Sequence, residues 1–192
     1  MKKLVMIALA ASTVIATPVA AQTVTGTVDI TGSVAPKCLV VPGAGSTFGT
    51  TVALGELAQA DGTMRTDLSS SFSSVGGVGL ETRVVCTTAN PTIAVNATPL
   101  ATAVTADTGY DNSIDFRARV LVDTTTANDV LFTNDSNDPD GSAVLIGGRL
   151  ANNGGNNIKI EADMFRTGAL TDLLVASPTY AGQIVVVIAP GS

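Results

Sequence analysis

Residues 22–34 have the sequence QTVTGTVDITGSV, in which apolar and polar side chains alternate. One side of the alternation holds Val24, Gly26, Val28 and Ile30. The other side holds Thr25, Thr27, Asp29 and Thr31. A period of two is typical of a β-strand with one buried face. The apolar face has two possible destinations, the interior of its own domain or the surface of another subunit.

The segment before this stretch has the features of a secretion signal. Met1, Lys2 and Lys3 form a short basic start, residues 4–15 are mostly apolar, and Val19 and Ala21 fit a small-x-small cleavage site. The apolar part is shorter than the roughly 20 residues that a membrane-spanning helix needs, and no later stretch qualifies. We therefore expect residues 1–21 to be removed as a signal peptide and the protein to be exported without membrane insertion.

The composition limits both the fold and the partners. Val, Thr, Ala and Gly dominate while Lys and Glu are scarce, which is typical of β-proteins. The 16 Asp and Glu residues outnumber the 10 Lys and Arg residues, for a net charge of -6. Such an acidic surface argues against nucleic acid and anionic membranes as partners.

The chain has two cysteines, Cys38 and Cys86. In an exported protein two cysteines predict one disulfide, and only one pairing is possible. The chain-entropy model gives a loop of this length a stabilisation of about 4 kcal/mol.

Short alternating or apolar runs continue along the chain, separated by segments rich in Gly, Asn, Asp and Pro. The predicted strands cover residues 51–57, 80–86, 92–97, 114–122, 130–132, 143–150, 158–164 and 184–188. Residues 58–74 are expected to form a loop with one weak strand. One face of 114–122 holds Ile114, Phe116, Ala118, Val120 and Val122, and one face of 158–164 holds Ile158, Ile160, Ala162 and Met164. Short strands at this spacing indicate an all-β fold, a β-sandwich, in one domain over residues 35–192.

The sequence offers little catalytic chemistry. It has no histidine, hence no imidazole base or histidine metal ligand, and a bridged cysteine pair leaves no thiol nucleophile. Asp115, Glu161 and Asp163 fall on strand faces that we predict to be exposed, where a solubilising role is the simpler interpretation. We therefore predict no catalytic residues and no cofactor.

Residues 134–141, NDSNDPDG, form the one carboxylate-rich cluster. Its oxygen atoms could bind Ca²⁺, but the spacing does not fit an EF-hand loop. A solvated surface turn is the simpler interpretation, so we predict no metal site.

The last apolar run, residues 184–188 (IVVVI), stops just before the end of the sequence. A continuous run of this kind suits a strand buried on both faces. Its edge needs a cover, because an uncovered apolar edge promotes aggregation. The pattern favours a neighbouring strand of the same domain and leaves a strand from another molecule open.

Several stretches resemble a known family. Residues 24–30, followed by Cys38, Leu39 and Val40, look like the start of mature chaperone–usher pilus subunits, most closely the archaic branch related to the spore coat protein U family. Residues 48–49 and 52–57 are similar to that family's strand after the first cysteine, and residues 80–86 to its strand ending in the second. Residues 180–188, YAGQIVVVI, resemble its final strand. The likeness covers both ends of the chain and is weaker over residues 95–165.

The resemblance implies an immunoglobulin-like β-sandwich that lacks its last strand. In that family a periplasmic chaperone fills the gap, and the N-terminal segment of the next subunit then replaces the chaperone's strand. Residues 22–34 would be the donor-strand extension, and its donated face would be Val24, Gly26, Val28 and Ile30. The acceptor groove would lie along Ile184, Val186 and Ile188. The implied partners are copies of the chain or related pilus subunits, a periplasmic chaperone and an outer-membrane usher.

These features lead us to expect a non-enzymatic structural subunit of a cell-surface or extracellular fibre that supports adhesion or biofilm formation. Two alternatives stay open. One is a monomeric secreted or outer-surface β-sandwich that binds a ligand through residues 98–112 and 123–142. The other is a hydrolase, which would need two distant carboxylates about 5–10 Å apart across a cleft.

Overall fold

The computed structural model describes residues 25–41, 48–74, 80–138 and 141–191. The predicted signal peptide, residues 1–21, and Val24 lie outside these ranges. The chain divides into two units, Met1–Ser33 and Val34–Ser192. In the first unit residues 25–33 form neither helix nor strand, and the side chains of Val28 and Ile30 are 85% and 93% exposed. The strand predicted here is not formed, because a lone extended segment has no partner for its backbone groups.

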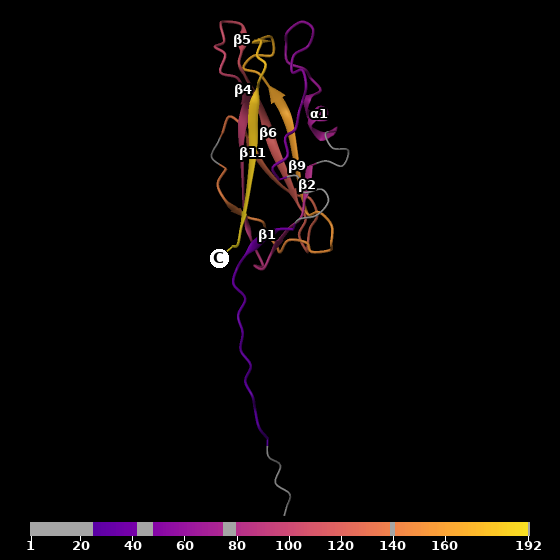
Figure 1. Ribbon diagram of the computed structural model, residues 1–192, viewed down its shortest axis with the longest axis vertical. Coiled ribbons are helices and arrows are strands. Elements are labelled where there is room, and N and C mark those ends of the chain that lie inside the picture. The colour runs from indigo at the N-terminus through magenta and orange to yellow at the C-terminus, as the bar shows by residue number, and fades with distance from the viewer. Residues whose placement is uncertain (1–24, 42–47, 75–79, 139–140, 192) are drawn as a thin grey trace, which may run out of the picture. The chain divides into compact units, whose positions relative to one another are not determined.

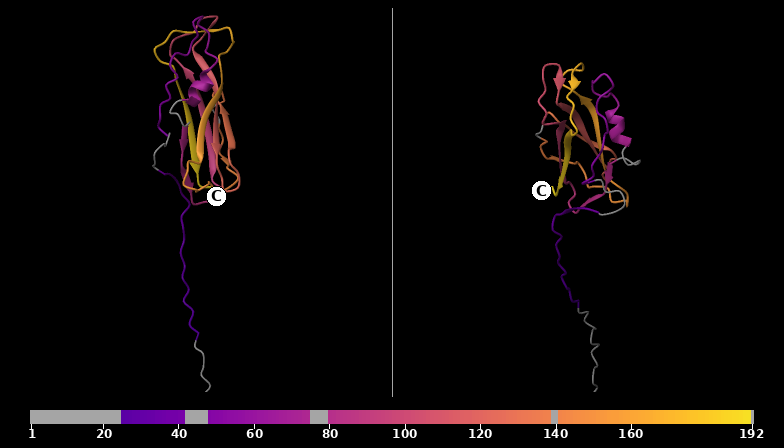
Figure 2. Two further views of the ribbon diagram at one scale, coloured as in Figure 1. Left: turned by 90° about the vertical axis from the view of Figure 1, so that its right-hand side faces the viewer. Right: turned by 45° about the horizontal axis from the view of Figure 1, so that its top comes forward.

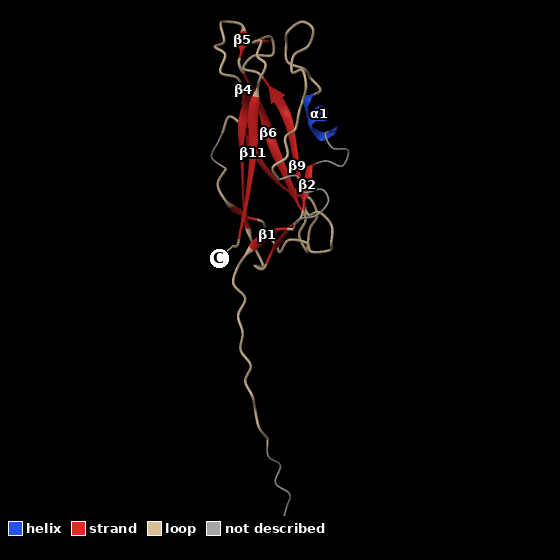
Figure 3. Cartoon of the chain, viewed as in Figure 1, coloured by secondary structure: helices blue, strands red, loops and turns tan. Residues whose placement is uncertain are grey.

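The second unit, called the body below, is nearly all β (Figure 3). Its strands are β1 (Cys38–Val40), β2 (Leu80–Thr82), β3 (Val84–Cys86), β4 (Thr92–Ala101), β5 (Tyr110–Asp111), β6 (Ser113–Val122), β7 (Val130–Asp135), β8 (Val144–Leu145), β9 (Ile158–Arg166), β10 (Leu173–Leu174) and β11 (Ala181–Ala189). The described part of the chain contains one helix, α1 (Leu68–Ser74), which at seven residues is too short to cross a membrane.

The strands form antiparallel sheets around one core. The main path has the order β11-β4-β6-β9-β2, with β7 paired to β6 and β8 to β4. The end of β4, at Leu100 and Ala101, pairs with the start of β6. The rest of β6 lies between β7 and β9. Two short pairs, antiparallel β1-β3 and parallel β10-β5, lie at opposite ends of the body (Figure 1).

The alternation in β6 builds the centre of the core. Every second side chain from Ile114 to Val122 is buried, as predicted. Between the buried residues, β6 carries two arginines that lie opposite acids of β9. Arg117 pairs with Asp163 and Arg119 with Glu161, each at 2.9 Å. These two acids are therefore partly buried ion-pair partners, and the prediction of a simply exposed face is wrong because the strand register places arginines opposite them.

One residue of β9 departs from the predicted alternation. Met164 is 54% exposed and has a φ of 53°, although we predicted that it would share the buried face of Ile158. The register against β6 shifts at this point, so β9 has one residue more than its partner between Asp163 and Arg166. This bulge turns Met164 outward, and the next residue, Phe165, packs against the core instead.

The residues before β2 form a helix where a loop and a weak strand were predicted. Leu68 and Phe72, four positions apart, are 1% and 9% exposed, so they share the buried face of α1. α1 packs against β9, and Figure 2 shows it beside that strand. The prediction failed because seven residues are too few to show a helical period.

Three other predicted strands have different limits. Residues 80–86 divide into β2, which pairs with β9, and β3, which pairs with β1. Of residues 143–150 only β8 is a strand, whereas β4 continues to Ala101, beyond the predicted end. Strand ends depend on where a neighbouring strand begins and ends, which the local pattern does not encode.

Candidate functional site

β11 lies at the edge of the main sheet. Along one side it pairs with β4 from Ala181 to Ala189, and no described strand pairs with its other side. Alternate N–H and C=O groups of an edge strand have no partner in the sheet. The free side of β11 is therefore open to an added strand.

The apolar side chains of β11 alternate between two faces. Ile184, Val186 and Ile188 stand opposite Ala97, Val95 and Ile93 of β4. They pack against the core but stay partly exposed, as expected for residues that line a groove. On the other face Val185 and Val187 are 39% and 50% exposed. The prediction of a strand buried on both faces is therefore wrong for the body, because only the face with Ile184, Val186 and Ile188 packs against the core.

Two cavities lie at the two ends of β11. One, of about 290 Å³, is lined by the last residues of β11, by β1, and by Phe48 and Val84. The other, of about 710 Å³, is lined by residues 51–58, Leu100 and residues 174–180, which lead into β11. Their described linings contain one carboxylate, that of Glu56. The two cavities therefore offer apolar space and backbone groups rather than a carboxylate pair.

Residues 48–57 form the wall that faces these cavities. Phe48, Val52 and Leu54 pack against the core and are partly exposed. The strand predicted over 51–57 is not formed, since the first bridge in this part of the described chain joins Ala58 to Met64. The segment keeps the alternating burial of a strand but has no strand beside it. It is thus a second segment without a partner strand, and Phe48 at its start shares the smaller cavity with the end of β11.

Arg65 holds this wall in place. Its Nη1 donates hydrogen bonds to the carbonyl oxygens of Glu56 at 2.8 Å and Leu54 at 3.4 Å. Its Nε and Nη2 bind the carboxylate of Asp67, and this hydrogen bonding lowers the pKa of Asp67. Sequence reasoning missed this role, although Arg65 is the one cation between residues 58 and 74.

Tyr180 closes the other end of the site. Its hydroxyl donates a hydrogen bond to the carbonyl of Val175 at 2.9 Å and lies 3.4 Å from the carbonyl of Asp111. Burial raises the pKa of this hydroxyl, with a smaller contribution from the charge of Asp111. The contact fixes the turn that leads residues 174–180 into β11.

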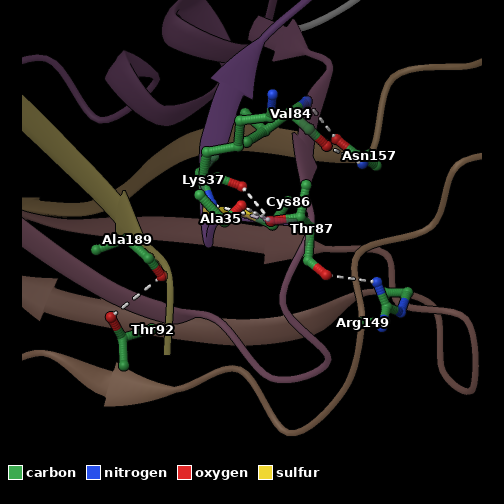
Figure 4. The surroundings of a disulfide bond; sticks show 10 residues. Ala35, Lys37, Val84, Cys86, Thr87, Thr92, Arg149, Asn157 and Ala189 are labelled. Atoms are coloured by element: carbon green, nitrogen blue, oxygen red, sulfur yellow. Dashed lines mark hydrogen bonds between the residues drawn. A yellow bond between two sulfur atoms is a disulfide. The ribbon is translucent and has the colours of Figure 1, made fainter. Parts of the chain in front are cut away.

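The predicted disulfide is confirmed. Cys38 and Cys86 are directly opposite residues of β1 and β3, with Cα atoms 4.1 Å apart. Figure 4 shows the bond beside Thr87, whose backbone N–H donates to the carbonyl of Lys37 at 2.9 Å. Because Cys38 lines the smaller cavity, the disulfide ties one wall of the candidate groove to β3.

The predicted donor residues are not placed against this groove. Val24 lies outside the described residues, and Gly26, Val28 and Ile30 belong to the first unit. Of the predicted acceptor residues, Val186 and Ile188 line the smaller cavity together with Phe48, whereas Ile184 packs against the same core without lining either cavity.

The acidic segment at residues 134–141 is not a simple surface loop. Asn134 and Asp135 end β7, and Asn134 and Ser136 are buried. The Asn134 side chain accepts a hydrogen bond from the Ala97 N–H and donates one to the carbonyl of Asp138, both at 2.8 Å. Among the residues that the structure describes, which leave out Asp140, no group of three acidic or cysteine side chains could hold a metal ion.

No family model, curated protein or solved structure matches the chain. The open edge of β11, residues 48–57 and the two cavities beside them are therefore the features that bear on function.

Proposed function

We propose that this protein is a structural subunit of an extracellular fibre and that its copies join by donor-strand exchange. Residues 22–34 of one copy would enter the groove beside β11 of another and complete an immunoglobulin-like β-sandwich. The observation that carries this proposal is that one side of β11 and both sides of residues 51–57 have no partner among the described strands. A cavity adjoins each segment: the end of β11 and Phe48 line one, and residues 51–58 and 174–180 line the other. An added strand would pair with both edges.

The dimensions and chemistry of the two parts agree. β11 has nine residues, a length of about 30 Å, and the 13 residues of the donor segment span about 40 Å when extended. The donor face carries the apolar side chains of Val24, Val28 and Ile30, and burial of each contributes about 1.5–3 kcal/mol. Ladder hydrogen bonds along both edges add to this, so the combined interaction suits a stable fibre joint.

The remaining parts of the proposal follow from the family resemblance. A periplasmic chaperone would cover the groove before assembly, an outer-membrane usher would export the subunit, and the fibre would serve adhesion or biofilm formation. The disulfide is consistent with an oxidising, non-cytosolic location. A non-catalytic role accords with groove cavities whose described lining holds a single carboxylate.

A competition experiment tests the joint directly. The full chain, denatured with its disulfide intact, is diluted into buffer, and fibres are followed by light scattering and electron microscopy. Excess synthetic peptide of residues 22–34 should cap the grooves and stop growth. A peptide with Val28→Asp should lose this effect, because the charge would enter an apolar groove. The matched peptide with Thr27→Asp changes the opposite face and should still inhibit.

Deletion of residues 22–30 gives the complementary result. The shortened chain should bind the peptide but form no fibres. Fibres from the shortened chain would refute the proposal. A stable monomer that does not bind the peptide would instead favour the alternative function, a secreted β-domain that binds a ligand.

A further inference from the structure

The loop before β9 has the sequence NNGGNN over residues 152–157. Residues 152–156 are exposed, whereas Ala151 and Asn157 on either side are buried. Asn153 is the one asparagine of the sequence that a glycine follows. An exposed asparagine can lose its side-chain amide to water without an enzyme, and it does so most easily when the backbone nitrogen that follows it is unhindered.

This reaction, deamidation, begins within the chain. The backbone nitrogen of Gly154 would attack Cγ of Asn153 and close a five-membered succinimide ring. The side-chain nitrogen would leave as ammonia, together with the proton that the backbone nitrogen gives up. Water then opens the ring at one of its two carbonyl carbons. Opening at Cγ leaves aspartate, and opening at the backbone carbon leaves isoaspartate, in which the main chain runs through the side chain. The sum is the hydrolysis of an amide to a carboxylate and ammonia, with no change of oxidation state.

Gly154 provides the unhindered nitrogen that the first step needs. Its φ is 94°, a left-handed conformation that glycine adopts without steric cost. No atom lies within 4 Å of the place that a Cβ would occupy. The N–H of Gly154 donates no hydrogen bond to a described residue. The nitrogen is therefore not held away from the Asn153 side chain.

A hydrogen bond from the next residue holds the amide that is attacked. The N–H of Gly155 donates to Oδ1 of Asn153 at 3.3 Å. Negative charge develops on this oxygen when the nitrogen adds to Cγ. A donor that already points at a developing negative charge lowers the barrier to the reaction.

The two other exposed asparagines of the loop lack this arrangement. Oδ1 of Asn152 accepts a hydrogen bond from Nη2 of Arg83, and the residue after Asn152 carries a side chain. Asn156 is also followed by a residue with a side chain, and its Nδ2 donates to Glu81 at 3.3 Å. The loop therefore favours reaction at its second asparagine.

The ends of the loop are joined to each other. Nδ2 of Asn157 donates to the carbonyl of Ala151 at 2.7 Å, which links the residues on either side of the exposed stretch. The N–H groups of Ala151 and Asn157 donate to the carbonyls of Asp123 at 2.9 Å and Thr82 at 3.1 Å. Figure 4 shows Asn157 against Val84. A chemical change within residues 152–156 thus leaves these connections in place.

We propose that Asn153–Gly154 is a site of spontaneous deamidation in the folded protein. The loop gains one carboxylate, which takes the net charge of the full chain from -6 to -7, and the body keeps its fold. The reaction needs only water, so it proceeds whether or not the chain forms fibres. Chains of different age would then differ in surface charge at this loop.

Peptide mapping of the full chain tests the site. The folded protein, with its disulfide intact, is incubated at mildly alkaline pH and then digested with trypsin. Cleavage after Arg149 and Lys159 releases residues 150–159, and fragment masses distinguish the asparagines within this peptide. Asn153 should convert at least about tenfold faster than Asn152 or Asn156, which corresponds to a difference of about 1.4 kcal/mol in the barrier.

Two exposed positions of the loop supply matched variants. Isoelectric focusing should show an acidic form that accumulates with time in the wild type. Asn153→Ser should abolish this form, whereas Asn156→Ser should accumulate it at the wild-type rate. The deamidated wild type should unfold at the same urea concentration as the fresh protein.

Three results would overturn the proposal. The fold protects the site if Asn153 stays intact in the folded chain under conditions that convert it in a free peptide of residues 150–159. Equal conversion of Asn152 or Asn156 would contradict the role given to Gly154. Unfolding of the deamidated chain at lower urea concentration would show that the loop is not independent of the body.

Discussion

At the scale of single residues, buried amides connect segments that the sheets leave unpaired. Asn157 is 2% exposed and directly precedes β9. Its Oδ1 accepts a hydrogen bond from the Val84 N–H at 2.8 Å, and its Nδ2 donates to the carbonyls of Val84 and Ala151, both at 2.7 Å. One side chain thus ties β3 to the start of β9 and to the loop before it.

Replacement of Asn157 by Ala should therefore be costly. It leaves one buried N–H and two buried carbonyls without their partner, so we expect a loss of about 2–4 kcal/mol in the free energy of unfolding. The neighbouring Asn156 is exposed, and its one described side-chain hydrogen bond, to Glu81, is 3.3 Å long. Asn156→Ala should change stability by less than about 0.5 kcal/mol. Urea denaturation measures both values, and equal effects would contradict this assignment.

At the scale of elements, the candidate site is made by two segments that each have at least one side without a partner strand. β11 has one partner strand and residues 51–57 have none, although both show the alternating burial of strands. A strand stays open at an edge only if its side chains still pack on a core, as Ile184, Val186, Val52 and Leu54 do. An added strand would convert both segments into ladder strands.

Hydrogen exchange should detect this conversion. With the peptide of residues 22–34 bound to the full chain, amides of residues 51–57 and alternate amides of β11 should exchange more slowly, because they acquire ladder partners. The amides of β6 lie between two strands already and should change little. The Val28→Asp peptide is the control and should give no added protection. If only the amides of β7 or β8 exchanged more slowly, the peptide would bind at another edge of the sheet.

At the scale of the whole molecule, the disulfide joins two positions 48 apart in sequence and anchors the short β1 strand. β1 has three residues, and Leu39 and Val40 are 55% and 44% exposed, so packing alone holds it weakly. The covalent bond therefore adds to the backbone hydrogen bonds that join β1 to β3.

Removal of this bond should destabilise the body and loosen the groove. The double variant Cys38→Ala with Cys86→Ala should lose about 2–5 kcal/mol in the free energy of unfolding. Peptide binding should weaken as well, because β1 lines the smaller cavity. A reducing agent should shift the unfolding of the wild type by a similar amount and leave the variant unchanged. A variant as stable as the wild type would show that β1 is held by other contacts.

Residues with a strong local signal were predictable from the sequence. The period of two in β6 identified its buried face from Ile114 to Val122, and two cysteines left one possible pairing. In β6 local alternation is sufficient because the strand has one side against the core. The groove residues of β11 were instead expected from the family resemblance, since residues 184–188 form a continuous apolar run.

The remaining features depend on which segments become neighbours. The same alternation describes β4, which has partners on both sides, and residues 51–57, which have none, because a period of two reports faces and not edges. The bulge at Met164, the ion pairs of Arg117 and Arg119, and the hold of Arg65 on residues 54–56 arise from registers between distant segments. The sequence by itself determined which side chains of β6 face inward and which cysteines pair. Only the tertiary structure decided that β11 and residues 51–57 would both be left as open edges, because pairing is a property of two segments and neither one encodes it alone.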